Sequence, residues 1–211
     1  MQPWLLTSVL LCVVLPLLPR TGWPMLASEI YWWLLAAAVL VAVRREGRPL
    51  SVLGLKRPTV ATVGFGIAGA LTLVVATYVV VVLVLPALGL RDDGSSVSQL
   101  GALSLPVQIA LAVRAGVVEE LLYRGYLIGR GTEVIPSRWL PAILSVAAFT
   151  VAHATSWSPT HLIFVAISGA LLAGLFVWKR DLGANFIAHA GADLMLFLLA
   201  SLAAQGGSGA A

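Results

Sequence analysis

The sequence predicts an all-α protein, a polytopic transmembrane helical bundle, and two observations favour this fold class. Hydrophobic residues make up 60% of the 211 residues and charged residues only 10%, and the mean hydropathy is +0.98. Soluble domains carry about 25% charged residues. The apolar residues also gather in runs that approach the ~20 residues needed to cross a bilayer as a helix. We therefore expect one structural domain embedded in the lipid bilayer, with about seven spans in a range of about six to eight.

The apolar runs give the expected elements in chain order. They lie at about 4–18, 26–43, 59–88, 105–128, 138–156, 160–178 and 182–203. No Lys or Arg precedes the first run, so we interpret it as a retained helix and not as a cleaved signal peptide. In the third run, Gly64, Gly66 and Gly69 predict the close approach of a neighbouring helix. The tail after the last run is rich in Gly, Ala and Ser, which predicts disorder.

Basic residues in the loops predict the orientation. The loop from Arg44 to Arg57 is the most basic, so the positive-inside rule places it and the N-terminus in the cytoplasm. The acidic loop 91–96 is expected outside, and the chain is expected to be a multi-pass protein of the plasma membrane. The net charge of +4 lies mostly in these loops, and nothing in its pattern predicts nucleic-acid binding. The oligomeric state is left open.

Three charged side chains stand inside the fourth run, in the segment Glu119-Glu120-Leu-Leu-Tyr-Arg124. A charge at the bilayer centre costs about 2.5–3.5 kcal/mol, so these groups are expected to pair or to line a polar cavity. Glu120 and Arg124 are four residues apart on one helix face and are predicted to form an ion pair. Glu119 is rotated around the helix by about 100° from Glu120, so its carboxylate is expected to be left free to react. Arg114 lies off the face of Glu119 and is expected to snorkel outward or to pair with another helix.

Further polar residues stand in the later runs. His153 lies near the end of the fifth run, and Asn185, His189 and Asp193 form a stripe at helical spacing in the last run. Polar stripes of this kind face the interior of a membrane bundle. Carboxylates and imidazoles that converge from three helices favour acid/base or metal-assisted hydrolysis. Structural ion pairs and a proton relay in a small transporter are alternative interpretations of the same residues.

Three motifs carry a family resemblance. Glu119 to Arg124 fits EExxxR, Phe149 to His153 fits FxxxH, and His189 to Asp193 fits HxxxN/D, each on its own span and in the right order. In these motifs the chain resembles the CAAX protease and bacteriocin-processing (CPBP or Abi) family of intramembrane endopeptidases, which is related to the type II CAAX prenyl endopeptidases. The resemblance extends over about residues 105–199, and the loop 48–57 is similar to one that many bacterial members carry.

The resemblance implies a helical bundle whose site lies inside the membrane and opens toward the cytosol. It implies that Glu119 is the general base that activates water, that His153 helps to hold this water, and that His189 and Asp193 stabilise the oxyanion. Two further residues would organise the site, Glu120 and Arg124. The domain plan would be N-terminal helices with a basic cytoplasmic loop in 1–104, a catalytic core in 105–203 and a disordered tail in 204–211.

The resemblance leaves the cofactor open. Either the site works without a cofactor, or it binds Zn²⁺ through some of the residues Glu119, His153, His189 and Asp193. Asp193 stands where some members have Asn, and an ionised Asp repels an oxyanion. Asp193 is therefore expected to be protonated, hydrogen-bonded to His189, or a metal ligand.

The expected substrate is a membrane-associated or prenylated protein or peptide, hydrolysed by water that Glu and His activate. Two other functions stay open at this point. One is a non-proteolytic immunity or scaffold protein of the same fold, and the other is a small proton-coupled transporter.

Overall fold

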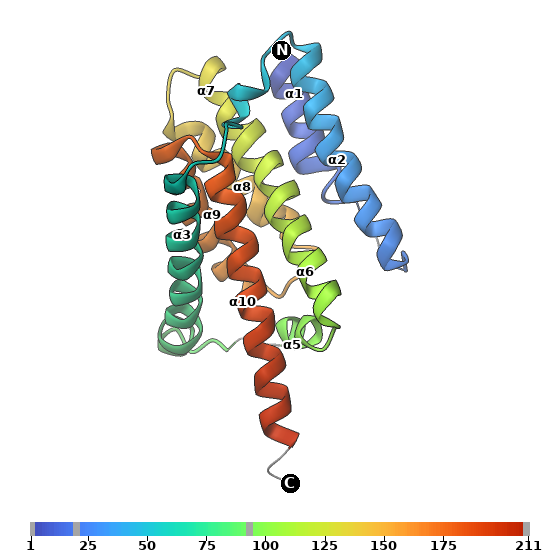
Figure 1. The fold of residues 1–211 in the computed structure, drawn as a ribbon, viewed down its shortest axis with the longest axis vertical. Helices are drawn as coiled ribbons and strands as arrows, with labels where there is room; N and C mark the ends of the chain where they lie inside the picture. Colours follow the sequence, from blue (N-terminus) through green and yellow to red (C-terminus); the bar gives the residue numbers. More distant parts are fainter. Residues whose placement is uncertain (1–2, 19–21, 92–94, 209–211) are drawn as a thin grey trace.

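The computed structural model describes residues 3–18, 22–91 and 95–208, and every regular element within them is helical. This confirms the all-α fold class. The elements stand side by side as one bundle (Figure 1). In chain order they are α1 (Pro3–Val9), η1 (Leu10–Val14), α2 (Met25–Arg45), η2 (Leu50–Leu53), α3 (Val60–Val79), η3 (Val80–Val84), α4 (Leu85–Ala87), α5 (Ser95–Gly101), α6 (Leu105–Arg114), η4 (Ala115–Glu119), η5 (Leu121–Arg130), α7 (Gly131–Val134), α8 (Trp139–His153), α9 (Pro159–Lys179) and α10 (Leu182–Ser208).

Most predicted spans correspond to long apolar helices. Helices long and apolar enough to cross a membrane cover Met25–Arg45, Val60–Ala87, Pro159–Lys179 and Leu182–Gln205. Two apolar helices are shorter, Trp4–Val14 and Trp139–His153. The predicted span 105–128 is helical without a break from α6 to α7, and it changes from α-helical to π-helical geometry where the charged residues begin. The expected number of about seven spans therefore agrees approximately with the structure.

Two predicted loop or tail segments contain helix. α10 continues to Ser208, so the described part of the predicted disordered tail 204–211 is helical, and residues 209–211 lie outside the described residues. The good helix formers Leu202, Ala203 and Ala204 explain why α10 does not end earlier. In the predicted acidic loop 91–96, residues 92–94 lie outside the described residues and α5 begins at Ser95.

Short polar side chains start the helices that flank the site. The Thr59 hydroxyl accepts a hydrogen bond from the Thr62 N–H, and the Thr62 hydroxyl accepts one from the Thr59 N–H, each at 3.1 Å. This reciprocal capping box starts α3. Arg180, with φ of 48°, ends α9 in the left-handed region, and Asp181 caps α10 by accepting from the Ala184 N–H at 3.3 Å. The chain thus changes direction within two residues and leads directly into the helix that carries His189.

Close packing between α3 and α10 depends on glycine. Figure 1 shows α10 running the length of the bundle between α3 and α6. A Cβ atom on Gly66 would lie 2.5 Å from Ile187 Cβ, and one on Gly69 would lie 2.8 Å from Ala188 Cβ. Both distances are shorter than two carbon atoms tolerate. The predicted close approach is confirmed at these two positions, whereas Gly64 faces open space.

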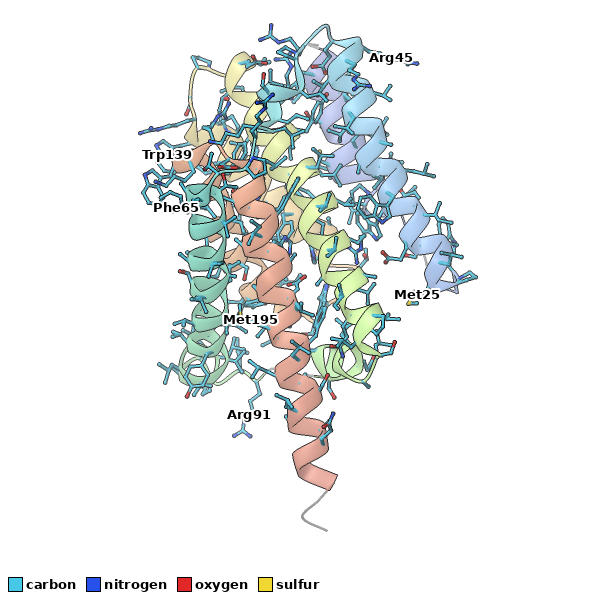
Figure 2. All side chains as sticks on the ribbon, viewed as in Figure 1. Met25, Arg45, Phe65, Arg91, Trp139 and Met195 are labelled. Atoms are coloured by element: carbon cyan, nitrogen blue, oxygen red, sulfur yellow. The ribbon has the colours of Figure 1, made fainter. Side chains whose placement is uncertain are left out.

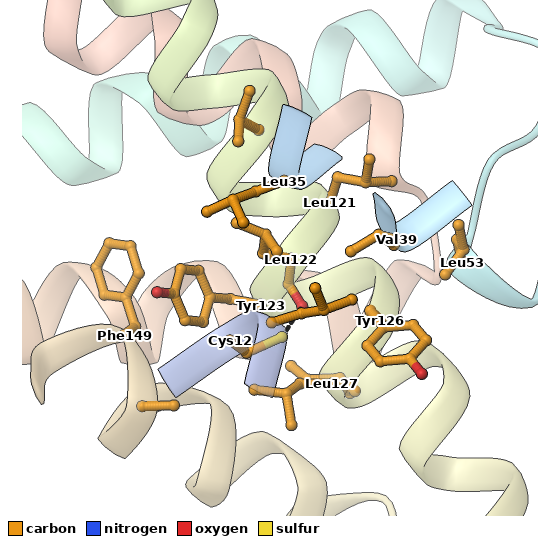
Figure 3. Close-up of a cluster of buried hydrophobic side chains, with 14 of the residues drawn as sticks. Cys12, Leu35, Val39, Leu53, Leu121, Leu122, Tyr123, Tyr126, Leu127 and Phe149 are labelled. Atoms are coloured by element: carbon orange, nitrogen blue, oxygen red, sulfur yellow. Dashed lines mark hydrogen bonds between the residues drawn. The ribbon is translucent and has the colours of Figure 1, made fainter. Parts of the chain in front are cut away.

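A buried cluster braces the helix that carries the acidic pair (Figure 3). Cys12 of η1 donates a hydrogen bond from Sγ to the Leu122 carbonyl at 3.4 Å. Leu35 and Val39 of α2 join the same cluster. The Tyr123 ring meets the Phe149 ring edge-on, with centroids 5.1 Å apart. The N-terminal helices therefore hold η5 from the side opposite to α10.

Candidate active site

Glu120 is completely buried and accepts three hydrogen bonds. Arg124 donates from Nη1 to Oε1 at 2.7 Å, which confirms the predicted pairing of these two residues. His189 donates from Nδ1 to the same oxygen at 2.9 Å, and Asn185 donates from Nδ2 to Oε2 at 3.0 Å. Both oxygens of this carboxylate accept hydrogen bonds, so Glu120 fixes the orientation of the three side chains that donate to it.

Arg124 and Asn185 extend this buried network to α9. Arg124 donates from Nη2 to the Gly169 carbonyl at 2.9 Å, and its guanidinium lies 4.6 Å from the centre of the Phe149 ring. Asn185 donates from Nδ2 to the Leu172 carbonyl at 2.9 Å as well as to Glu120. Since both partners of the amide are acceptors, its orientation is determined. The network therefore ties η5, α9 and α10 together behind the site.

Glu119 has different partners. Its Oε1 accepts a hydrogen bond from Arg114 Nη1 at 2.7 Å, and Arg114 Nε donates to Glu29 Oε2 of α2 at 3.2 Å. The expectation that Glu119 is free of an ion pair is therefore wrong, whereas the expected pairing of Arg114 with another helix is confirmed. An α-helix sets residues five apart about 140° from each other. Residues 115–119 form a π-helical turn, whose bonds join residues five apart, and this wider turn brings Arg114 and Glu119 to one side.

The other oxygen of Glu119 faces two imidazoles. Its Oε2 lies 3.7 Å from His153 Nε2 and 4.0 Å from His189 Nε2. His153 donates from Nδ1 to the Phe149 carbonyl at 2.7 Å, because a carbonyl oxygen only accepts. His189 likewise commits its Nδ1 proton to Glu120. In both rings Nε2 is therefore the atom turned to Glu119, at distances that suit a bridging water better than a direct hydrogen bond.

Phe149 explains the spacing of the FxxxH motif. Its carbonyl fixes the His153 ring one helical turn further along α8. Its own ring lies 4.4 Å from the His153 ring and 6.2 Å from the His189 ring, centre to centre. Phe149 thus packs against both imidazoles and against the Arg124 guanidinium.

Asp193 is more exposed than Glu119, His153 and His189. Its Oδ2 is 3.7 Å from His189 Nε2, and its side chain is 28% exposed. The distance is that of an ion pair and exceeds that of a direct hydrogen bond. Asp193 and Glu119 therefore flank the same nitrogen of His189.

Gly116 brings the acidic pair against α10. A Cβ atom at this position would lie 2.7 Å from Ala190 Cβ and 2.9 Å from the Phe186 carbonyl oxygen. Only glycine allows η4 to approach α10 this closely. Glu119 and Glu120 follow Gly116 by one helical turn, and His189 directly precedes Ala190 in α10. The close approach therefore places the acidic pair beside His189.

A cavity of about 750 Å³ begins at these residues. Arg114, Glu119, His153, His189 and Asp193 form one end of it, and most of the remaining lining is apolar. Its lining also includes the stacked pair Trp157 and His161, whose ring centres are 4.0 Å apart. All six sequence-predicted site residues lie in or directly behind this end. Sequence reasoning did not assign Arg114, Asn185 or Phe149 to the site, although Asn185 stands at helical spacing from His189.

The residues present do not form a metal site. Among the residues that the structure describes, no three His, Cys, Asp or Glu side chains are placed to hold a metal ion together. Arg114 moreover holds a positive charge 2.7 Å from Glu119 Oε1, and this charge repels a metal cation at the same carboxylate. We therefore derive no step through Zn²⁺ at Glu119, His153, His189 and Asp193.

Comparison with known proteins supports the motif assignment. Residues 101–195 match the family model described as type II CAAX prenyl endopeptidase, Rce1-like. No curated protein and no solved structure matches the chain. The matched segment contains the three motifs. Of the polar side chains described above for the site, only Glu29 lies outside it. Through the segment that builds this site, the chain is similar to the Rce1-like type II CAAX prenyl endopeptidases.

Proposed function

We propose that this protein is an intramembrane endopeptidase that hydrolyses a peptide bond in a membrane-associated or prenylated protein or peptide, with Glu119 as the general base. One observation carries the proposal. Glu119 lines the cavity, and its Oε2 lies 3.7 and 4.0 Å from the Nε2 atoms of His153 and His189. Glu120, in contrast, is completely buried, and each of its oxygens already accepts a hydrogen bond from a neighbouring side chain.

The proposed reaction consumes one water and needs no other reactant. Glu119 Oε2 accepts a proton from a water held by His153 Nε2, and the water oxygen forms a bond to the carbonyl carbon of the peptide. The carbonyl oxygen becomes an oxyanion, which accepts a hydrogen bond from His189 Nε2 in its doubly protonated form. The C–N bond then breaks, and the proton held by Glu119 passes to the departing amine. The products are a new carboxyl terminus and a new amino terminus.

The carboxylate substitution Glu119→Gln tests this proposal. Glutamine has nearly the same shape and cannot accept the proton, so cleavage of a peptide substrate by purified protein should fall by a factor of about 10²–10⁴. Thermal unfolding in detergent should change little. The matched control is Glu133→Gln at the exposed end of the bundle, which should retain full cleavage. Equal activity of Glu119→Gln and the unsubstituted protein would refute the mechanism.

The same variant separates the protease from a non-proteolytic scaffold. A binding function of the fold would preserve the cellular phenotype in Glu119→Gln and in His153→Ala. The proposed hydrolysis predicts that both variants lose it together with cleavage in the test tube.

Removal of metal ions gives an independent check. Because the positive charge of Arg114 already pairs with Glu119 and repels a second cation there, we expect cleavage to continue after treatment with a strong chelator such as 1,10-phenanthroline. Loss of activity that returns on addition of Zn²⁺ would show that a metal takes part.

A further inference from the structure

The cavity that contains the site extends toward one end of the bundle. Away from Glu119, its lining comes from the first turns of α2, from α5, from the segment after α8 and from the later turns of α10. These residues are Ser28, Val97, Leu100, Thr155, Ser156 and Phe197. Thr155 and Ser156 are exposed. Figure 1 shows α5 in the lower part of the molecule and the start of α2 at the lower end of that helix, both away from α7 at the top.

The opposite end is closed by packed side chains. Leu53, Tyr126, Phe176 and Leu182 each have no exposed surface, and all belong to one hydrophobic cluster. On their own helices, Tyr126, Phe176 and Leu182 lie one to two turns beyond the residues that line the cavity. Each of these turns leads away from Glu119, toward η2 and α7. No lining residue of the cavity comes from this layer.

Contacts of the segment around η2 stabilise this packed layer. The Leu182 N–H donates to the Gly54 carbonyl at 3.0 Å, and Lys56 Nζ lies 3.5 Å from Asp181 Oδ2. A Cβ atom on Gly54 would lie 2.7 Å from the Phe176 ring. A peptide has no path to Glu119 through this layer unless several of these contacts break.

Charge identifies the closed end as the cytoplasmic one. Nine of the 13 Lys and Arg residues lie there, namely Arg44, Arg45, Arg48, Lys56, Arg57, Arg130, Arg138, Lys179 and Arg180. Figure 2 shows Arg45 at one end of the molecule and Arg91 toward the other. Loops rich in Lys and Arg stay in the cytoplasm. The open end of the cavity therefore faces away from the cytoplasm.

From the cavity, the packed layer and the charge distribution we propose that the site is entered from the extracytoplasmic end of the bundle. This reverses the cytosolic opening that the family resemblance implies. The identity of what enters rests on the proposed function. It is an unfolded, apolar peptide segment of a secreted or membrane-anchored polypeptide. A cavity of about 750 Å³, within the ~300–1,000 Å³ of ligand pockets, takes a short segment and no folded domain.

Cysteine accessibility tests the direction of entry without any need for catalysis. The only native cysteine, Cys12, is fully buried and is replaced by Ala in the full-length background. His153→Cys places a thiol in the site. Ser156→Cys marks the rim of the cavity and Ser51→Cys the closed end, and both serines are exposed. A small membrane-impermeant thiosulfonate is applied to right-side-out and to inside-out membrane vesicles.

The expected result is loss of the free thiol of His153→Cys and Ser156→Cys in right-side-out vesicles, and of Ser51→Cys in inside-out vesicles. Ser28→Cys on the facing wall repeats the test, in case His153→Cys does not fold. Reaction of the site thiols from the same side as Ser51→Cys overturns the proposal. Reaction from neither side overturns it as well, because the cavity would then be closed at both ends.

A blocking experiment links entry to cleavage. Attachment of a bulky maleimide to Ser156→Cys should abolish cleavage relative to the same unlabelled variant, whereas the same label on Ser51→Cys should not. Cleavage that survives the label on Ser156→Cys contradicts entry at this end. If no variant cleaves any peptide before labelling, the proposed function fails, and the accessibility result still decides the direction of the opening.

Discussion

Arg114 Nη1 lies 2.7 Å from Glu119 Oε1, five residues further along a helix that widens to a π-helical turn between them. The same guanidinium bonds Glu29 on α2, so it connects the proposed base with the N-terminal half of the chain. Glu29 lies outside the segment that matches the family model. Arg114 thereby fixes which oxygen of Glu119 is turned toward the two imidazoles.

We expect Arg114 to be a positioning residue. Arg114→Gln leaves the Glu119 carboxylate without its orienting partner, and kcat should fall by about 10–100-fold, the usual effect of removing such a support. Arg114→Lys should restore part of kcat because it keeps the charge, and KM should change little in both variants. Steady-state kinetics separates the two constants. Arg91→Gln, an exposed position, is the control, and equal kcat for Arg114→Gln and this control would contradict the role.

Arg124 should be required for stability. Arg124→Met leaves the Glu120 carboxylate buried without its cation and should cost about 3–5 kcal/mol of unfolding free energy. Glu120→Gln combined with Arg124→Met removes both charges and should recover part of this loss. Thermal unfolding of the two single variants and the double variant in one detergent measures the coupling. Strictly additive losses would show that the pair contributes nothing beyond its separate members.

Gly116 should tolerate no side chain. Gly116→Val pushes η4 away from α10, because its Cβ would meet Ala190 Cβ at 2.7 Å. We expect a loss of about 1–3 kcal/mol, as for other overpacked sites, together with loss of cleavage. Gly64→Val is the matched control, since Gly64 has open space around it. Unfolding and activity are measured on both, and a similar response of the two variants would contradict the close approach.

Asp193→Asn should preserve cleavage. The carboxylate stands 3.7 Å from the nitrogen that we propose as oxyanion donor, and its charge opposes an oxyanion there. An amide removes that charge and adds N–H donors. Cleavage at or above the unsubstituted level is expected in a peptide assay, with Asp193→Ala as the comparison. A severe loss in Asp193→Asn alone would show that the negative charge itself is needed.

The fold class was predictable from the sequence, because hydropathy indicates a bundle of membrane helices. The motif residues were predictable as well, because charged and polar side chains stand out in apolar helices. The pairing of Glu120 with Arg124 followed from the four-residue spacing. The pairing of Arg114 with Glu119 did not, since it depends on a π-helical turn that α-helical periodicity cannot indicate. The roles assigned to the six predicted site residues remain proposals.

The common depth of the two imidazoles was not predictable either. At ~1.5 Å per residue, His189 lies about 10 Å from the start of α10 and His153 about 21 Å from the start of α8. Both nevertheless lie within 4.0 Å of one Glu119 oxygen. α8 and α10 therefore cannot start at one depth and run parallel. Their relative depth and tilt are set by tertiary packing, which residue spacing along one helix does not indicate.

The bond from Glu29 to Arg114 has a consequence for any attempt to transplant this site. A chimera that keeps residues 101–195 and takes its first helices from another protein inherits all three motifs but loses the acidic partner on α2. Arg114 would then be balanced by Glu119 alone. Such a chimera needs a carboxylate at the position of Glu29. A transplanted site must therefore include two separate parts of the chain, residues 101–195 and the part of α2 that carries Glu29.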